Sequence, residues 1–158
     1  MTRRPGSFRS RGAALALLGA AVLGACAGPP EGPATLDTRH EQCSFCRMGV
    51  SDRRFAAQVT ARGAEPTFFD DAGCLRDWLK EPTEKAPWTV WVSDHRTKTF
   101  VPAQTAVYAK SPTVQTPMSS GILAWADAAS RDADPAAAGC APVARGEVLG
   151  PLPEGKAP

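Results

Sequence analysis

FFDDAGCLRDWL, residues 68–79, is the stretch that best predicts the fold of this 158-residue chain. Its two phenylalanines predict a short buried strand, and Asp70 or Asp71 then offers the side-chain oxygen that caps a helix N-terminus. Three large apolar side chains recur at i, i+3 and i+4, so they share one helix face. They are Leu75, Trp78 and Leu79. The stretch therefore predicts a strand followed directly by an amphipathic helix.

The flanking segments predict two more strands. Phe55, Ala57, Val59 and Ala61 alternate with more polar residues, as in a half-buried strand. After the helix, which is expected to end near Pro82, the apolar run 88–92 predicts a central strand. Residues 41–95 are therefore predicted to form a first ββαβ-type half.

Residues 96–150 are predicted to repeat this order as a second half. A strand is expected over 105–109 and a last strand over 143–149, with a helix between them capped by Ser119 or Ser120. This helix would carry Ile122, Leu123, Trp125 and Ala126 and end before Pro135. A shift of 48 residues aligns Val59 with Val107, Gly73-Cys74-Leu75 with Gly121-Ile122-Leu123, and Asp70 with Met118. The predicted fold class is α+β, with two small ββαβ-type repeats packed together.

Soft sulfur donors gather at residues 43–48, CSFCRM. If residues 46–50 are extended, Cys46 and Met48 project to the same side. A thiolate beside a thioether suits Cu(I) better than zinc. The alternatives are a disulfide between Cys43 and Cys46 with Met48 as core filler, or a thiol-disulfide redox centre.

Met118 is a further candidate ligand because of its place in the chain. It follows Pro117, which prevents a helix from extending back through it. A methionine at such a turn is easily presented at the surface, so the sequence favours a ligand that the second half brings to the metal.

Other chemically interesting residues are given plainer interpretations. Cys74 is expected to be a small buried side chain, and Asp70-Asp71 to be helix caps. Neither His40 nor His95 falls in a motif that identifies it as a ligand. Cys140 lies in a predicted loop, with no role assigned.

The N-terminus predicts export. Residues 1–25 contain four arginines and no acid, followed by an apolar run too short to span a bilayer. The boundary Leu23-Gly24-Ala25-Cys26 resembles a bacterial lipobox, in which Cys26 would be lipidated and become the mature N-terminus. The alternative is an ordinary signal cut after Ala25. We therefore expect a membrane-anchored lipoprotein facing the periplasm or cell exterior.

Removing this leader changes the charge of the chain. Without its four arginines, 14 basic residues face 16 acidic ones, so the mature protein is slightly acidic and nucleic-acid binding is not expected. Residues 26–40 contain many prolines and glycines and predict a flexible tether, and residues 151–158 predict a disordered tail.

A family resemblance emerges from several segments in order: CSFCRM, RFAAQV, FFDDAGCLRDWL, WVSD, AVYAKS and TPMSSGILAWAD. Together they resemble the NosL family of copper-chaperone lipoproteins, which help to assemble nitrous oxide reductase. The resemblance implies a NosL/MerB-like fold with Cu(I) bound through sulfur. It also implies transfer of the metal to a membrane copper-transfer complex and a recipient cuproenzyme. The matching ligands would be Cys46, Met48 and Met118, with Cys43 as the second cysteine of the motif.

Three functions remain open at this stage. The chain is a Cu(I) metallochaperone, a thiol-disulfide oxidoreductase using Cys43 and Cys46, or a structural lipoprotein with a disulfide. No nucleophile, base and orienting group cluster in the sequence, so we expect no hydrolytic enzyme. A c-type haem is excluded at the CxxC motif because Arg47, not histidine, follows it.

Overall fold

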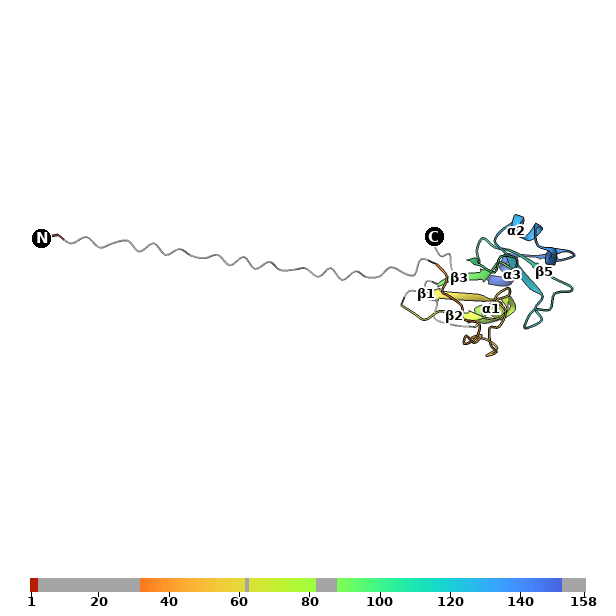
Figure 1. Ribbon diagram of the computed structural model, residues 1–158, viewed down its shortest axis with the longest axis horizontal. Coiled ribbons are helices and arrows are strands. Elements are labelled where there is room, and N and C mark those ends of the chain that lie inside the picture. Colours follow the sequence, from red (N-terminus) through yellow and green to blue (C-terminus); the bar gives the residue numbers. More distant parts are fainter. Residues whose placement is uncertain (3–31, 62, 82–87, 152–158) are drawn as a thin grey trace.

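The computed structural model describes residues 1–2, 32–61, 63–81 and 88–151, which form an α+β fold with two small antiparallel sheets (Figure 1). This confirms the predicted fold class. The strands are β1 (Ala57–Ala61), β2 (Thr67–Phe69), β3 (Trp88–Ser93), β4 (Phe100–Pro102), β5 (Val107–Lys110), β6 (Ile122–Trp125) and β7 (Ala141–Val143). The helices are α1 (Ala72–Leu79), α2 (Ala128–Asp132) and α3 (Arg145–Leu149), with a 3-10 turn η1 (Pro135–Ala137).

Several predictions fall on residues that the structure does not describe. They concern residues 3–25 of the leader, the lipidation site Cys26, Pro82 beyond the first helix, and the tail from residue 152. In the part of the chain that is described, no helix combines the length and apolar character needed to cross a bilayer.

The first sheet has the strand order β2-β1-β3-β4, so β3 is an interior strand as predicted. The strand β1 is more deeply buried than predicted, because Ala57 to Thr60 are all buried rather than alternately exposed. Its polar side chains have internal partners. Gln58 exchanges hydrogen bonds with the backbone of Ala34, at 2.8 and 3.0 Å, and Thr60 accepts one from Trp91 Nε1 at 3.1 Å. Paired in this way, polar groups can be buried on the outer face of a strand.

The same contacts show that part of the predicted tether packs against the fold. Leu36 is 2% exposed and joins the main core, and Ala34 is held by Gln58. The packed part of the chain therefore begins before the predicted boundary at residue 41.

The helix α1 forms where the sequence predicts it. Asp71, in extended conformation, is the N-cap, and its Oδ1 accepts a hydrogen bond from Gly73 N at 2.5 Å. Because Asp71 has this role, the neighbouring Asp70 is not needed as a cap. Leu75 is fully buried, and the Trp78 ring packs between the rings of Phe69 and Trp88.

Two elements of the second half differ from prediction. The predicted helix over residues 122–126 is instead the strand β6, which pairs antiparallel with β5, and its four residues are all buried. A short apolar run buried on both faces has no periodicity that separates a strand from a helix. The helix α2 comes later and is capped by Asp127. The predicted last strand is also wrong, because β7 ends at Val143 and residues 145–149 form α3.

The two halves nevertheless share one topology. One strand and one α-helix of residues 96–150 have no counterpart in this comparison: β4, which pairs with β3 at the edge of the first sheet, and the final helix α3. Apart from these, each half has the order strand, strand, helix, strand, and in each the first strand lies between the other two: β2-β1-β3 and β6-β5-β7. The helix caps Asp71 and Asp127 correspond at a separation of 56 residues, not 48. The shift of 48 fits β1 and β5 but fails beyond them, because the loop between β5 and β6 is longer than that between β1 and β2. Met118 lies in this longer loop, so it is not the counterpart of Asp70.

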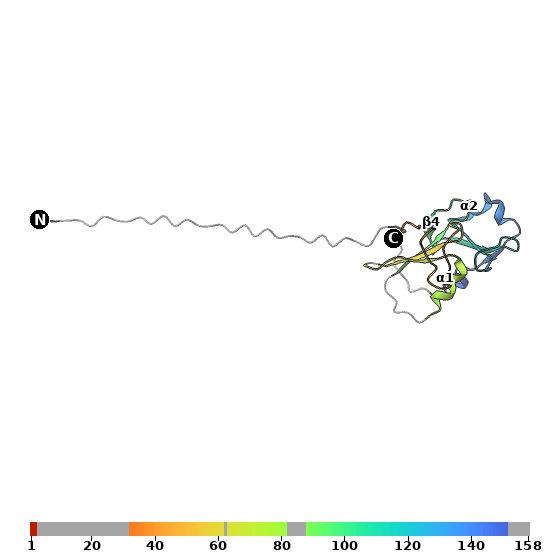
Figure 2. The ribbon, with the colours of Figure 1, turned by 60° about the horizontal axis from the view of Figure 1, so that its bottom comes forward.

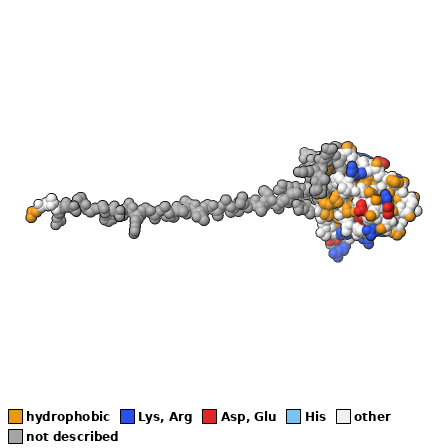
Figure 3. All heavy atoms as spheres, turned by 90° about the horizontal axis from the view of Figure 1, so that it is seen from above, with side chains coloured by type: hydrophobic (Ala, Val, Ile, Leu, Met, Phe, Trp, Pro, Cys, Tyr) orange, Lys and Arg blue, Asp and Glu red, His pale blue; other side chains and the backbone are white. Residues whose placement is uncertain are grey.

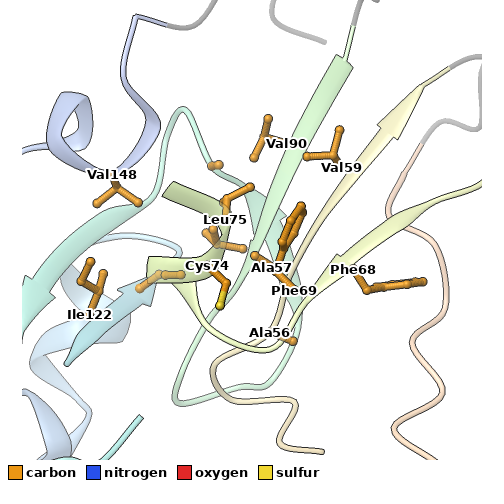
Figure 4. Packing of buried hydrophobic residues seen from close by; sticks show 14 of the residues in the cluster. Ala56, Ala57, Val59, Phe68, Phe69, Cys74, Leu75, Val90, Ile122 and Val148 are labelled. Atoms are coloured by element: carbon orange, nitrogen blue, oxygen red, sulfur yellow. The ribbon is translucent and has the colours of Figure 1, made fainter. Parts of the chain in front are cut away.

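The main core is shared between the halves, and α1 lies at its centre. Val59 and Val90 of the first sheet lie on one side of Leu75, while Ile122 of β6 and Val148 of α3 lie on the other (Figure 4). In a second view α1 again lies against the first sheet, close to the C-terminal elements (Figure 2). Since the helix fills the space between the halves, residues near its N-terminus are within reach of both.

Charged side chains form no single-sign patch on the face shown in Figure 3. There Lys and Arg are interspersed with Asp and Glu among apolar and uncharged groups.

Candidate metal centre

The CSFCRM segment folds back on itself as a tight loop. Its ends are joined by a bridge between Gln42 and Gly49, and Cys43 N donates to Met48 O at 2.7 Å. Arg47 adopts a left-handed conformation, with φ of 67°. The extended geometry predicted for residues 46–50 is therefore wrong at its start, because the chain turns there. This turn brings Cys46 back toward Cys43.

A backbone hydrogen bond attaches this loop to the first sheet. Ser44 N donates to Phe68 O of β2 at 2.9 Å. The strand β2 then leads directly into Asp70 and the first turn of α1, which carries Cys74 (Figure 4). The loop and the strand-to-helix junction are thus fixed to each other, although they are separated in the sequence.

Four potential metal donors meet at this junction. The sulfur atoms of Cys43, Cys46 and Cys74 and one carboxylate oxygen of Asp70 all lie within 4.8 Å of one another. Three of the four side chains are almost fully buried: Cys43 is 0%, Asp70 1% and Cys74 2% exposed, whereas Cys46 is partly exposed. We call these four residues the thiol cluster. Among these four residues, Cys46 is the one that solvent reaches.

Burial disfavours the thiolate forms of Cys46 and Cys74. It raises the pKa of Cys74, and the nearby Cys43 and Asp70 raise it further. Burial also raises the pKa of Cys46, although a hydrogen bond from the Met48 backbone opposes this effect. The Cys46 thiol donates weakly to Asp70, at 3.5 and 3.7 Å. A metal ion that binds here must displace thiol protons.

The spacing of the thiol cluster fits a metal ion. Metal–sulfur bonds of about 2.3 Å place the sulfur atoms roughly 3.8 Å apart in tetrahedral geometry and roughly 4.6 Å apart in linear geometry. The observed limit of 4.8 Å is close to this range, so small side-chain shifts suffice for binding. Three sulfur donors indicate a soft or borderline metal, with Asp70 able to complete a fourth position.

The two methionines predicted as ligands lie on loops that border the thiol cluster. Met48 is 52% and Met118 41% exposed. Among the described residues between 32 and 151, the large apolar side chains that are exposed are these two methionines and Phe45. Met48 directly follows the turn that carries Cys46. The backbone N–H of Met118 donates to Asp71, beside the Asp70 of the cluster, at 3.1 Å. The structure therefore brings Cys43 and Cys46 together and places both methionines on adjoining segments.

Sequence analysis missed two members of the cluster. Cys74 was interpreted as core and Asp70 as a cap, yet both are donors in the cluster. No spacing motif links them to the CxxC motif, because the link is the hydrogen bond between Ser44 and Phe68. A weak signal existed: Asp70 and Cys74 are four residues apart across a strand-to-helix junction.

The remaining candidates do not belong to the cluster. His40 is exposed and pairs with Asp37 at 2.8 Å. His95 is buried and bonds through Nδ1 to Asp134 of the second half at 2.7 Å. Cys140 donates to Ala136 O at 3.2 Å and packs in a separate small apolar cluster.

The fold and the thiol cluster together define a small α+β protein with a candidate soft-metal site. Residues 33–140 match the family described as NosL, and the chain belongs to this family. Membership suggests a copper-binding accessory function, which the donor set of the thiol cluster fits. Neither the curated proteins nor the solved structures contain a match to the chain.

Proposed function

We propose that the protein is a metallochaperone that carries Cu(I) on the thiol cluster and delivers it for the maturation of a cuproenzyme. The observation that carries this proposal is the convergence of three thiols within 4.8 Å of one another, on and beside segments that carry two exposed methionines. Thiolate and thioether sulfur are the donors that Cu(I) prefers, whereas zinc rarely recruits a thioether. The copper ion is the cargo of this protein rather than a resident cofactor.

The burial of the donors suggests which of them retain the metal ion and which are replaced first during transfer. Cys43 and Cys74 are sealed from solvent and would retain the ion against competing thiols. Cys46 is partly exposed, and Met48 and Met118 are exposed, so these three would be the ligands that a partner replaces first. Transfer by stepwise replacement of ligands never requires a free copper ion.

Family membership supports a specific recipient. As a NosL protein, the chain would pass copper to a membrane copper-transfer complex and on to nitrous oxide reductase or a related cuproenzyme. The burial of the inner thiols is consistent with a carrier that works in an oxidising compartment, because exposed thiolates are oxidised most readily.

The oxidoreductase alternative finds less support in the geometry of the cluster. A reactive cysteine requires a lowered pKa, commonly supplied by a helix N-terminus or a neighbouring cation. Cys46 instead lies in a turn beside Asp70, and its pKa is raised. We therefore consider a non-enzymatic role the better interpretation of the CxxC motif.

The proposal predicts that the reduced full-length protein binds one Cu(I) and prefers it to Zn(II). The reason is that the candidate donors combine thiolates with thioethers. Anaerobic competition against a Cu(I) chelator, in parallel with a Zn(II) titration, measures both affinities. Insulin-reducing activity without Cu(I) affinity would instead support the oxidoreductase.

The proposal also includes a lipid anchor at Cys26, supported by the lipobox-like boundary before it. On expression in a bacterial host, the protein is expected to enter the detergent phase on phase partitioning, because a diacylated N-terminus binds membranes. The control is Cys26→Ser, which should move to the aqueous phase. A wild-type protein found entirely in the aqueous phase would rule the anchor out.

A further inference from the structure

The loop that carries Met118 reaches across to the first half of the fold. It joins β5 and β6 of the second sheet, yet two of its residues donate hydrogen bonds to Asp71, the N-cap of α1. Asp71 Oδ2 accepts from Met118 N at 3.1 Å, and Oδ1 accepts from the Ser120 hydroxyl at 2.6 Å. The same Oδ1 accepts from Gly73 N. One fully buried carboxylate therefore fixes both the helix that carries Cys74 and the loop that carries Met118.

Gly73 allows the loop to approach α1 this closely. A Cβ atom at position 73 would lie 2.6 Å from Ser120 Cβ and 2.8 Å from Asp71 Oδ1. Such distances are shorter than any ordinary contact, so a side chain at position 73 would force the loop away. The φ of Gly73 is not positive, so it is the close approach that requires glycine here.

The loop itself is held in a defined shape. Ser119 and Gly121 have positive φ angles of 56° and 68°, and Ser119 N donates to Thr116 O at 2.9 Å. Gly121 N donates to the buried Thr116 hydroxyl at 3.1 Å. A fixed backbone thus holds a methionine whose side chain is 41% exposed. A methionine that served only to fill the core would be buried instead.

From these contacts we infer that Asp71 and Gly73 are positioning residues, which hold the thioether of Met118 at the opening of the thiol cluster. The inference rests on the proposed Cu(I) function and adds to it a coupling between the two halves. Neither residue touches the metal. Their role is to keep the second half's ligand in register with the cysteines of the first half.

The test is a double-mutant cycle on Cu(I) affinity, measured by anaerobic chelator competition with the full-length protein. Gly73→Ala inserts the clashing Cβ without altering a ligand. Its matched control is Gly146→Ala in α3, where a Cβ meets nothing within 4 Å. Asp71→Asn is a second variant expected to fold, because asparagine is an equally good N-cap. In asparagine, however, an amide nitrogen that cannot accept a hydrogen bond replaces one of the two carboxylate oxygens. Either the Met118 N–H, or the Gly73 N–H and the Ser120 hydroxyl, would then lose their acceptor.

We expect Met118→Leu alone to weaken Cu(I) binding about tenfold, which corresponds to roughly 1.4 kcal/mol. Gly73→Ala and Asp71→Asn should each weaken it to a similar extent, whereas Gly146→Ala should not. When Met118→Leu is combined with Gly73→Ala or Asp71→Asn, it should weaken Cu(I) binding little further, because the thioether is already displaced. A purely structural contact would lower stability without abolishing the effect of Met118→Leu.

Three results would overturn the inference while leaving Cu(I) binding by the cysteines intact. The first is a Cu(I) affinity of Met118→Leu equal to that of the wild type. The second is a double variant whose loss of affinity is the product of the losses in the two single variants. The third is a Cu(I) affinity of Gly73→Ala equal to that of Gly146→Ala. A wild-type protein without Cu(I) affinity would overturn the proposed function itself, so the two failures are distinguishable.

Discussion

Cys46→Ser is expected to weaken Cu(I) binding by about a hundredfold, or roughly 2.7 kcal/mol. Serine has nearly the same shape, but its hydroxyl is a hard, neutral donor that Cu(I) does not favour. Cys46 is the partly exposed member of the thiol cluster, and Met48 follows it by two residues, so we expect its loss to affect both the retention and the release of the metal. Anaerobic competition against a chelator of known affinity provides the measurement.

Cys140→Ser is a matched control for this substitution. Cys140 is also a free, partly exposed cysteine, and its thiol likewise donates one weak hydrogen bond, to Ala136 O. It lies in a separate apolar cluster. Equal Cu(I) affinities for Cys46→Ser and Cys140→Ser would show that the CxxC motif does not bind the metal.

Cys74→Ser and Cys74→Ala are expected to weaken Cu(I) binding about a hundredfold, or roughly 2.7 kcal/mol, as for Cys46→Ser. This prediction comes from the geometry alone, because the sequence favours a core cysteine at position 74. A ligand and a core side chain differ in what their loss changes. Removing a ligand lowers Cu(I) affinity and also lowers the gain in melting temperature on copper binding.

The two substitutions at Cys74 separate these effects. Serine buries a hydroxyl, whereas alanine leaves a small cavity, so their costs to stability have different causes. A shared loss of affinity in both variants can come only from the missing sulfur. If both variants are less stable but bind Cu(I) as tightly as wild type, Cys74 is a core residue.

The first half of the fold could be predicted well because its signals are local. Asp71 is a cap two residues before Gly73, and the apolar face of α1 repeats with helical spacing. The second half lacks such signals at β6. Its run Ile122 to Trp125 is buried on both faces, so neither helical nor strand periodicity is visible.

The candidate site was predicted only in part, for a related reason. Cys43 and Cys46 form a motif that is visible in the sequence, and they do lie in the thiol cluster. Asp70 and Cys74 join them through packing of the CxxC loop against β2, which no sequence spacing encodes. The assignment of Met48 and Met118 as ligands stays a prediction, supported by their place on the bordering loops.

X-ray absorption at the copper edge tests the central claim most directly, because it reports the atoms bound to the metal. The anaerobically loaded full-length protein should show copper as Cu(I), with a first shell made mainly of sulfur atoms at about 2.3 Å, the length of a typical metal–thiolate bond. A first shell made mainly of nitrogen or oxygen would contradict the account.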